Sequence, residues 1–176
     1  MRHSACALLA LALLFLPPAR GAALEEKTVK ATASWTGQGR FIPTGTDIVY
    51  FVGTLSGTVF VEDEGSILNG AKLLCLGTLE VQVPSAKQSG AGRCVVGDAK
   101  GNQVYAQWQC SGTHQVECKG PFTITGGSGR FKGITGQGEL HLRSSIAEIA
   151  IGRPGVDNQE TGAGLIEWPA LRYRIP

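Results

Sequence analysis

Three ionisable side chains stand at alternate positions in the last quarter of the chain. Glu139, His141 and Arg143 alternate with Leu140 and Leu142, and on a β-strand such residues share one face. Inside a cavity they would combine an acid, an imidazole and a guanidinium able to bind a carboxylate or move a proton. On the outside they would form a solvated stripe, and we favour this orientation because charged side chains are seldom buried without a partner.

A further candidate catalytic residue, Glu80, alternates with Leu79 and Val81 in the same way, so the outward orientation is again favoured. Once the N-terminal region is set aside, the histidines are His114 and His141, and neither lies in a nucleophile motif. The sequence therefore offers no Ser-His-Asp arrangement, and it leaves open whether the protein is an enzyme.

Cys110, His114 and Cys118 are separated by three residues each. Two thiolates and an imidazole suit zinc, but a structural site needs a fourth ligand. An exported protein favours oxidation over metal binding, so we expect no metal and a disulfide that closes the loop 111–117. Cys75 and Cys94 are then left to pair by elimination, and the other two connectivities stay open from the sequence.

The N-terminal region has the layout of a secretory signal peptide. Arg2 precedes an apolar run at residues 5–16, followed by two prolines and small residues up to Ala23. The run is shorter than the roughly 20 residues of a membrane-spanning helix. We therefore expect residues 1–23 to be removed and residues 24–176 to form one soluble domain with no stable membrane insertion. Of the five cysteines, Cys6 leaves with the run, and four remain for two disulfides.

Charge excludes some partners. The chain has 16 basic and 14 acidic residues, and loss of Arg2 and Arg20 leaves 14 of each. A neutral domain lacks the basic surface of a nucleic-acid-binding protein or a polybasic membrane patch. About 150 residues suffice for a single core.

The remaining pattern is that of an all-β protein. Its 25 glycines, with scattered Val, Ile and Thr, indicate short strands and tight bends. Strands are expected at residues 28–35, 47–62, 73–83, 93–97, 103–109, 118–125, 134–143 and 165–175. Residues 98–102 predict a hairpin turn, Gly53 and Gly57 a bend or bulge, and residues 144–151 either a strand or a short helix. The pattern predicts a closed barrel or a sandwich.

One glycine-rich segment carries a family resemblance. Residues 125–138, TGGSGRFKGITGQG, resemble the GGTGxFxGxTGxG signature of small secreted bacterial proteins in the allene oxide cyclase barrel superfamily, which also includes plant dirigent proteins. The segments CVVGD at 94–98, VYAQW at 104–108 and WPALRY at 168–173 resemble the same bacterial proteins. The resemblance implies an eight-stranded antiparallel barrel of the allene oxide cyclase-like or calycin-like kind, secreted or periplasmic. Ser128 stands where the signature has Thr.

The glycine segment is interpreted as scaffold. Gly126, Gly127 and Gly129 permit the positive backbone angles of a sharp bend, and Phe131 can plug the barrel end. A dinucleotide loop is disfavoured because GxGxxG would need glycine at Lys132. The signature contains no acid, base or nucleophile, so no catalytic residue is carried over from the family, and no cofactor is expected.

Three functions fit these observations. We favour a non-catalytic barrel that binds a small apolar molecule or serves as a structural envelope protein. Trp35, Trp108 and Trp168 are its candidate ligand-binding residues, although tryptophan is more often core. A cofactor-free cyclase or isomerase rests on the resemblance alone, and an interaction module would use the loop 152–164. An apolar cavity would favour the first, a charged cavity the second and a filled lumen the third. The sequence does not specify the oligomeric state.

The signal peptide interpretation predicts that the exported protein begins at about Ala22 or Leu24. N-terminal sequencing of the exported form checks this, and retention of Met1 would refute it.

Overall fold

The computed structural model describes residues 25–144 and 160–176. Three predicted features lie wholly or partly outside the described residues: the signal peptide, residues 145–151 of the element expected at 144–151, and residues 152–159 of the proposed interaction loop.

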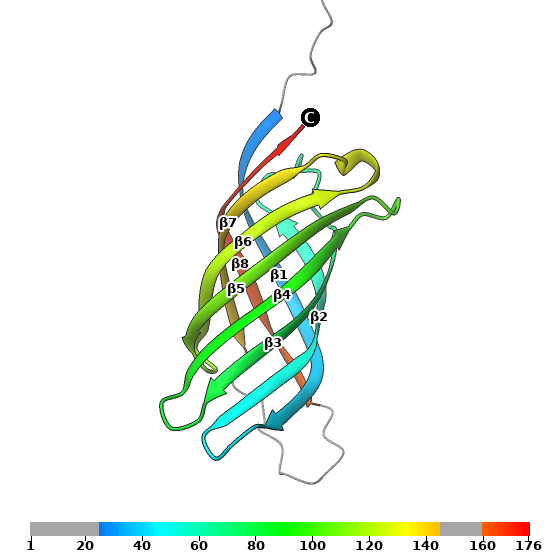
Figure 1. The fold of residues 1–176 in the computed structure, drawn as a ribbon. Coiled ribbons are helices and arrows are strands. Elements are labelled where there is room, and N and C mark those ends of the chain that lie inside the picture. Colours follow the sequence, from blue (N-terminus) through cyan, green and yellow to red (C-terminus); the bar gives the residue numbers. More distant parts are fainter. Residues whose placement is uncertain (1–24, 145–159) are drawn as a thin grey trace, which may run out of the picture.

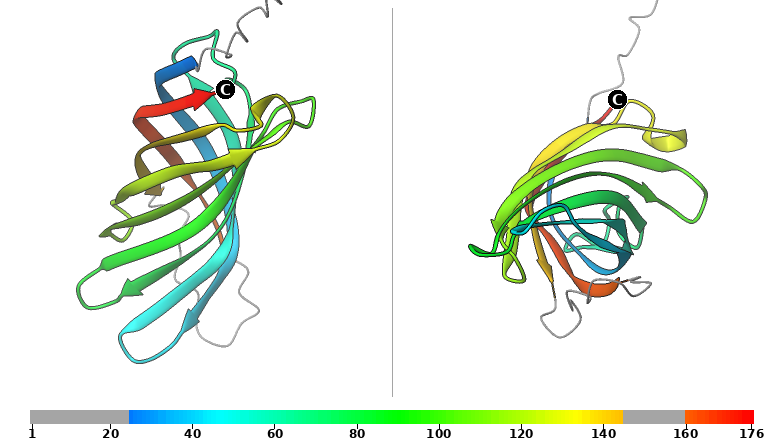
Figure 2. Two further views of the ribbon diagram at one scale, coloured as in Figure 1. Left: turned by 45° about the horizontal axis from the view of Figure 1, so that its top comes forward. Right: turned by 60° about the horizontal axis from the view of Figure 1, so that its bottom comes forward.

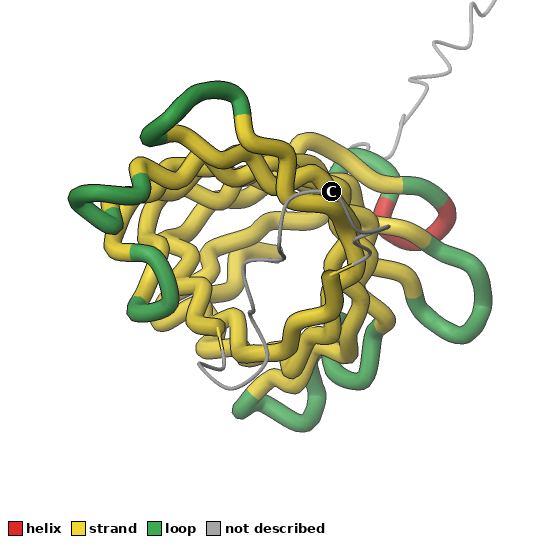
Figure 3. The backbone as a smooth tube through the Cα atoms, turned by 90° about the horizontal axis from the view of Figure 1, so that it is seen from below, coloured by secondary structure: helices red, strands yellow, loops and turns green. Residues whose placement is uncertain are grey.

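Eight antiparallel strands close into one barrel, in which each strand pairs with its sequence neighbours and β8 pairs with β1 (Figure 1). The strands are β1 (Glu25–Pro43), β2 (Ile48–Val61), β3 (Lys72–Gln82), β4 (Lys87–Gly97), β5 (Gln103–Thr113), β6 (Glu117–Gly127), β7 (Thr135–Ser144) and β8 (Glu160–Ile175), with a short 3-10 turn η1 (Gly129–Phe131). Viewed along its axis, the barrel is a closed ring of strands (Figure 3). The predicted all-β, eight-stranded antiparallel barrel is confirmed.

Side chains alternate between the lumen and the outside. Along β5, Val104, Ala106 and Trp108 are buried, whereas Tyr105 and Gln107 are exposed. This is the period of two that a pleated strand imposes. The same alternation from the other strands makes the lumen one continuous apolar core, and closing the ring leaves no unpaired sheet edge.

Several strands are longer than the sequence predicted. β1 continues to Pro43 and β4 begins at Lys87, because glycines that looked like turn residues remain paired in the ladder. Gly53 and Gly57 do not end β2, as expected, and they lie in regular register with both neighbouring strands, so no bulge is present there. Pairing with two neighbours overrides the weak local strand propensity of glycine.

One end of the barrel is closed by loops. Leu68, from the β2–β3 connection, and Phe131 and Ile134, from the β6–β7 connection, are all buried in the core. The β6–β7 loop also contacts the β4–β5 turn (upper loops of Figure 2, left): Arg130 Nε lies 2.9 Å from Asp98 Oδ2. Hydrogen bonds from Asn102, with help from the Arg130 charge, lower the pKa of Asp98. The glycine segment is therefore a docked cap, as its interpretation as scaffold predicted.

Both predicted disulfides form. Cys75 pairs with Cys94 between β3 and β4, and Cys110 pairs with Cys118 between β5 and β6. All four residues are buried and belong to the lumen core. The closed segments span 19 and 8 residues, and bridges of this size stabilise by about 3 kcal/mol each in the chain-entropy account.

The cap predicts a contrast between two neighbouring residues. Gly129 has φ of 58° and a Cβ there would lie 1.9 Å from Asn102 Oδ1, so Gly129→Val should lower the free energy of unfolding by at least about 1–3 kcal/mol. Exposed Lys132 is the control, and Lys132→Ala should change it by no more than about 0.5 kcal/mol. Urea denaturation measures both. A Gly129→Val protein as stable as wild type would show that the segment is not scaffold.

Candidate functional site

A cavity opens at the end of the barrel opposite the cap. It lies beside the β1–β2, β3–β4 and β5–β6 turns, and the centre of a water-sized molecule can occupy about 50 Å³ of it. Its lining residues are the aromatic Trp35, Phe41, Phe51 and Trp108, the aliphatic Leu55, Leu79 and Leu142, the polar Gln88, His114 and Ser144, and four glycines, Gly37, Gly53, Gly77 and Gly162. Among these described lining residues none is Asp, Glu, Lys or Arg. As far as the described residues line it, the cavity is uncharged and largely apolar.

A row of inward-facing glycines forms part of the wall at this level of the lumen. Gly39 pairs with Gly53, Gly53 with Gly77, and Gly77 with Gly92, so four neighbouring strands present bare backbone at one level. The row ends at Trp108 of β5, the partner of Gly92. An eight-stranded barrel is normally just wide enough for its side chains to fill. Without a Cβ at four consecutive positions, large side chains can lie directly against the backbone at this level of the lumen.

Flat aromatic rings lie directly on these glycines. A Cβ on Gly77 or on Gly92 would stand 2.6 Å from the Trp108 indole, and a Cβ on Gly53 would stand 2.5 Å from the Phe51 ring. Trp35 lies in the same way against Gly164 of β8, where a Cβ would be 2.8 Å from its ring. Any side chain at these glycines would displace a ring that lines the cavity.

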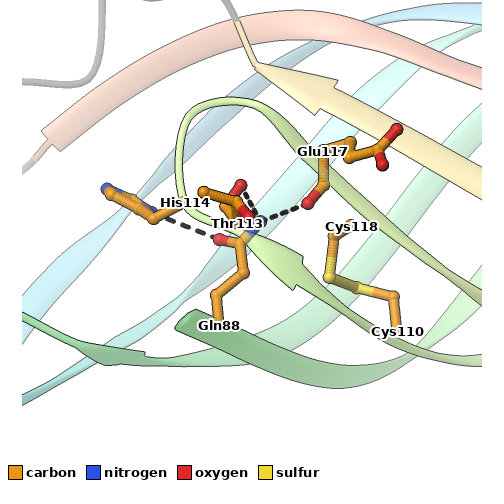
Figure 4. The surroundings of a disulfide bond; sticks show 6 residues. All are labelled: Gln88, Cys110, Thr113, His114, Glu117 and Cys118. Carbon is orange, nitrogen blue, oxygen red and sulfur yellow. Dashed lines mark hydrogen bonds between the residues drawn. A yellow bond between two sulfur atoms is a disulfide. The ribbon is translucent and has the colours of Figure 1, made fainter. Parts of the chain in front are cut away.

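The polar side of the cavity is built at the β5–β6 turn. The backbone N–H of His114 donates to Ala86 O at 2.7 Å, which joins this turn to the β3–β4 turn. The Cys110–Cys118 disulfide closes the base of the turn (Figure 4). The Phe41 ring meets the imidazole edge-on, with centroids 6.4 Å apart. The backbone at His114 is thus held by the β3–β4 turn and the neighbouring disulfide, and its ring contacts Phe41 of β1.

Gln88 sets the orientation of this imidazole. Its Nε2 donates to Thr113 O at 3.3 Å and to Glu117 O at 3.1 Å, and its Oε1 lies 3.2 Å from His114 Nδ1 (Figure 4). Since both carbonyls require the amide NH₂, the Gln88 oxygen must face His114, and Nδ1 must carry the proton. Burial lowers the pKa of His114, which favours a neutral ring with a lone pair on Nε2.

Two polar atoms of lining residues lack a partner within residues 25–144 and 160–176: His114 Nε2 and Trp35 Nε1. The first is a hydrogen-bond acceptor and the second a donor. Buried polar groups are normally satisfied. Each of the two atoms exposes less than 1 Å² of surface, so a bound molecule could supply the missing donor or acceptor only by displacing a neighbouring side chain.

The structure separates the sequence candidates. Trp35 and Trp108 line the cavity, whereas Trp168 packs deeper in the core against Phe122, with ring centroids 5.2 Å apart. The sequence offers His114 as a zinc ligand, yet its neighbouring cysteine sulfurs are joined in a disulfide. No group of three potential metal ligands occurs in the part of the chain that the structure describes.

The charged candidates lie outside the barrel. Glu139, His141 and Arg143 form the outer row of β7, with His141 Nε2 3.0 Å from Glu139 Oε1 and Arg143 Nε 3.5 Å from Glu167 Oε2. Glu80 also faces outward, where it accepts a hydrogen bond from Tyr50. The favoured outward orientation is confirmed, and none of the four lines the cavity.

Sequence reasoning missed Gln88 and the glycine row. Gln88 is separated from His114 by 26 residues, and only the barrel register brings them together. The glycines do leave a signal, because Gly37 and Gly39, Gly90 and Gly92, and Gly162 and Gly164 each stand two residues apart. On a strand that spacing places both members of a pair on one face.

Comparisons with known proteins add little. No family model and no curated protein matches the chain. A solved structure of a pterocarpan synthase dirigent protein aligns with 88% of this chain and 94% of its own, at 12% identity and a TM-score of 0.41. We base no argument on so distant a similarity. Within the described residues, no helix has the length and apolarity to cross a membrane.

The buried imidazole predicts a pH dependence of stability. Burial lowers the pKa of His114 in the folded protein. Below the ordinary histidine pKa of about 6.5, the unfolded chain therefore binds more protons than the folded protein. The free energy of unfolding must then fall as the pH drops below about 6.5. Urea denaturation at pH 7 and pH 5 should show a larger loss for wild type than for His114→Phe. An equal loss in both proteins would contradict the burial of this ring.

Proposed function

We propose that the barrel binds a small, uncharged, largely apolar molecule in the cavity at its open end. The observation that carries the proposal is the cavity itself, whose described lining is uncharged and whose aromatic rings lie against glycine backbone. Small-molecule sites are typically concave, apolar and supplied with a few oriented polar groups. The aromatic walls and the Gln88–His114 pair match that description.

Export belongs to the same proposal. A signal peptide at residues 1–23 and a barrel domain at residues 24–176 would place the protein in the periplasm or outside the cell. The two buried disulfides support an oxidising compartment, where such bonds persist.

The His114 imidazole also favours a second candidate, a cofactor-free isomerase or cyclase. A neutral imidazole inside an apolar cavity is a suitable general base. Such a reaction also needs a group that stabilises the charge developing on the substrate, and among the described lining residues no carboxyl or ammonium group could do so. Binding without turnover is therefore the function that the geometry supports best.

A cavity-filling substitution tests binding. Propylbenzene, a neutral hydrocarbon, should shift the indole N–H resonances of Trp35 and Trp108 in an NMR titration, because both rings line the cavity. Leu79→Trp places a larger side chain in the same space and should weaken binding roughly tenfold or more.

Leu76→Trp provides the matched control, since Leu76 lies on the same strand but faces outward and is 64% exposed. It should bind propylbenzene as wild type does. Absence of any shift in wild type, or equal weakening by both substitutions, would contradict the proposed site.

A further inference from the structure

The hydrogen bonds around Gln88 determine what kind of atom the cavity offers to a ligand. Its amide NH₂ is engaged by the carbonyl oxygens of Thr113 and Glu117, and the Gln88 side chain is 7% exposed overall. The orientation of the amide is therefore dictated by backbone, not by the ligand. His114 must donate from Nδ1 to Gln88 Oε1, which leaves Nε2 as an acceptor.

That acceptor lies among apolar groups. His114 lines the cavity together with Phe41, Phe51 and Leu79, and its Nε2 has no partner anywhere in the described ranges. A buried acceptor without a donor costs free energy, and a donor supplied by a ligand would remove that cost. Because Nε2 exposes less than 1 Å², the ligand must displace a neighbouring side chain, such as the Phe41 ring that meets the imidazole edge-on, to reach it.

We propose that the ligand is a neutral apolar alcohol whose hydroxyl group donates a hydrogen bond to His114 Nε2. This inference rests on the function proposed above and adds the chemical class of the ligand. The hydrocarbon body lies between the Trp35 and Trp108 walls, and the hydroxyl meets the imidazole. Gln88 is a positioning residue, because it acts on the ligand only through the tautomer of His114.

The same cavity should bind carboxylic acids poorly. A carboxylate in this cavity would lose its hydration shell, and the described lining residues include no Lys or Arg to compensate its charge. The lowered pKa of His114 keeps the imidazole uncharged as well. A carboxylate would also bring only acceptor oxygens to an acceptor nitrogen.

Three compounds with one hydrocarbon body test the class: 3-phenylpropan-1-ol, its methyl ether and 3-phenylpropanoate. The ether keeps an oxygen that can accept from the Trp35 N–H and removes only the donor. In NMR titrations of the purified, disulfide-bonded protein at pH 7, the alcohol should bind about fivefold more tightly than the ether, as one neutral hydrogen bond implies. The carboxylate should bind at least about tenfold more weakly than the alcohol.

A matched pair of variants assigns the preference to one ring. His114→Phe should reduce the ratio of alcohol to ether affinity to about one, because the acceptor is lost. His141→Phe makes the same change at the outward histidine of β7 and should leave the ratio as in wild type. Nitrogen-15 spectra of wild type should also show His114 protonated at Nδ1 and unprotonated at Nε2, a measurement that needs no variant to fold.

The outcomes separate the two claims. Equal binding of alcohol and ether in wild type, a preference that survives His114→Phe, tighter binding of the carboxylate, or a proton on Nε2 would each overturn the alcohol proposal while propylbenzene binding still supported the site. If propylbenzene and all three compounds leave the indole resonances unshifted, the proposed function fails, and the alcohol proposal with it.

Discussion

The lumen of an eight-stranded barrel has room for little more than its own side chains, and this constraint governs the whole molecule. At most levels here, inward residues such as Val104, Ala106 and Leu140 fill the space. At one level Gly53, Gly77 and their paired glycines supply only backbone, and Trp108 lies flat on that surface. Interior packing is close to that of a crystal, so the bare backbone of this row gives the Trp108 and Phe51 rings the room to lie against it and to line the cavity beside it.

The two ends of the barrel differ: one is packed by loops and the other contains the cavity. At the closed end, Phe131 and Leu68 enter the core, and Arg130 ties the cap to the neighbouring turn. At the open end, apolar rings surround a single oriented imidazole. The disulfides join neighbouring strands inside the lumen, and the Cys110–Cys118 bridge stands at the base of the turn that carries His114. A rigid frame therefore holds the groups that would meet a ligand.

Local signals predicted most of the frame. Period-two alternation identified the strands, cysteine spacing and elimination identified both bridges, and the glycine signature identified the cap. The site depended on register, which local signals do not contain: Gly39, Gly53 and Gly77 become a row only after three strands pair. Gln88 and His114 likewise meet only because their two turns lie at the same barrel end. Alternation placed Glu139 and His141 on one face, but only the fold showed that the face is outside.

The proposed binding of an apolar alcohol depends on the cavity that Trp35 and Trp108 line and on His114 Nε2 as the hydrogen-bond acceptor. The most direct measurement is a crystal structure of the protein purified from its natural source without stripping bound molecules. If an apolar alcohol is bound, the map should show continuous extra electron density between Trp35 and Trp108 that ends within hydrogen-bonding distance of His114 Nε2. A structure in which Phe41 and Phe51 turn inward and fill that space, so that no cavity remains, would contradict it.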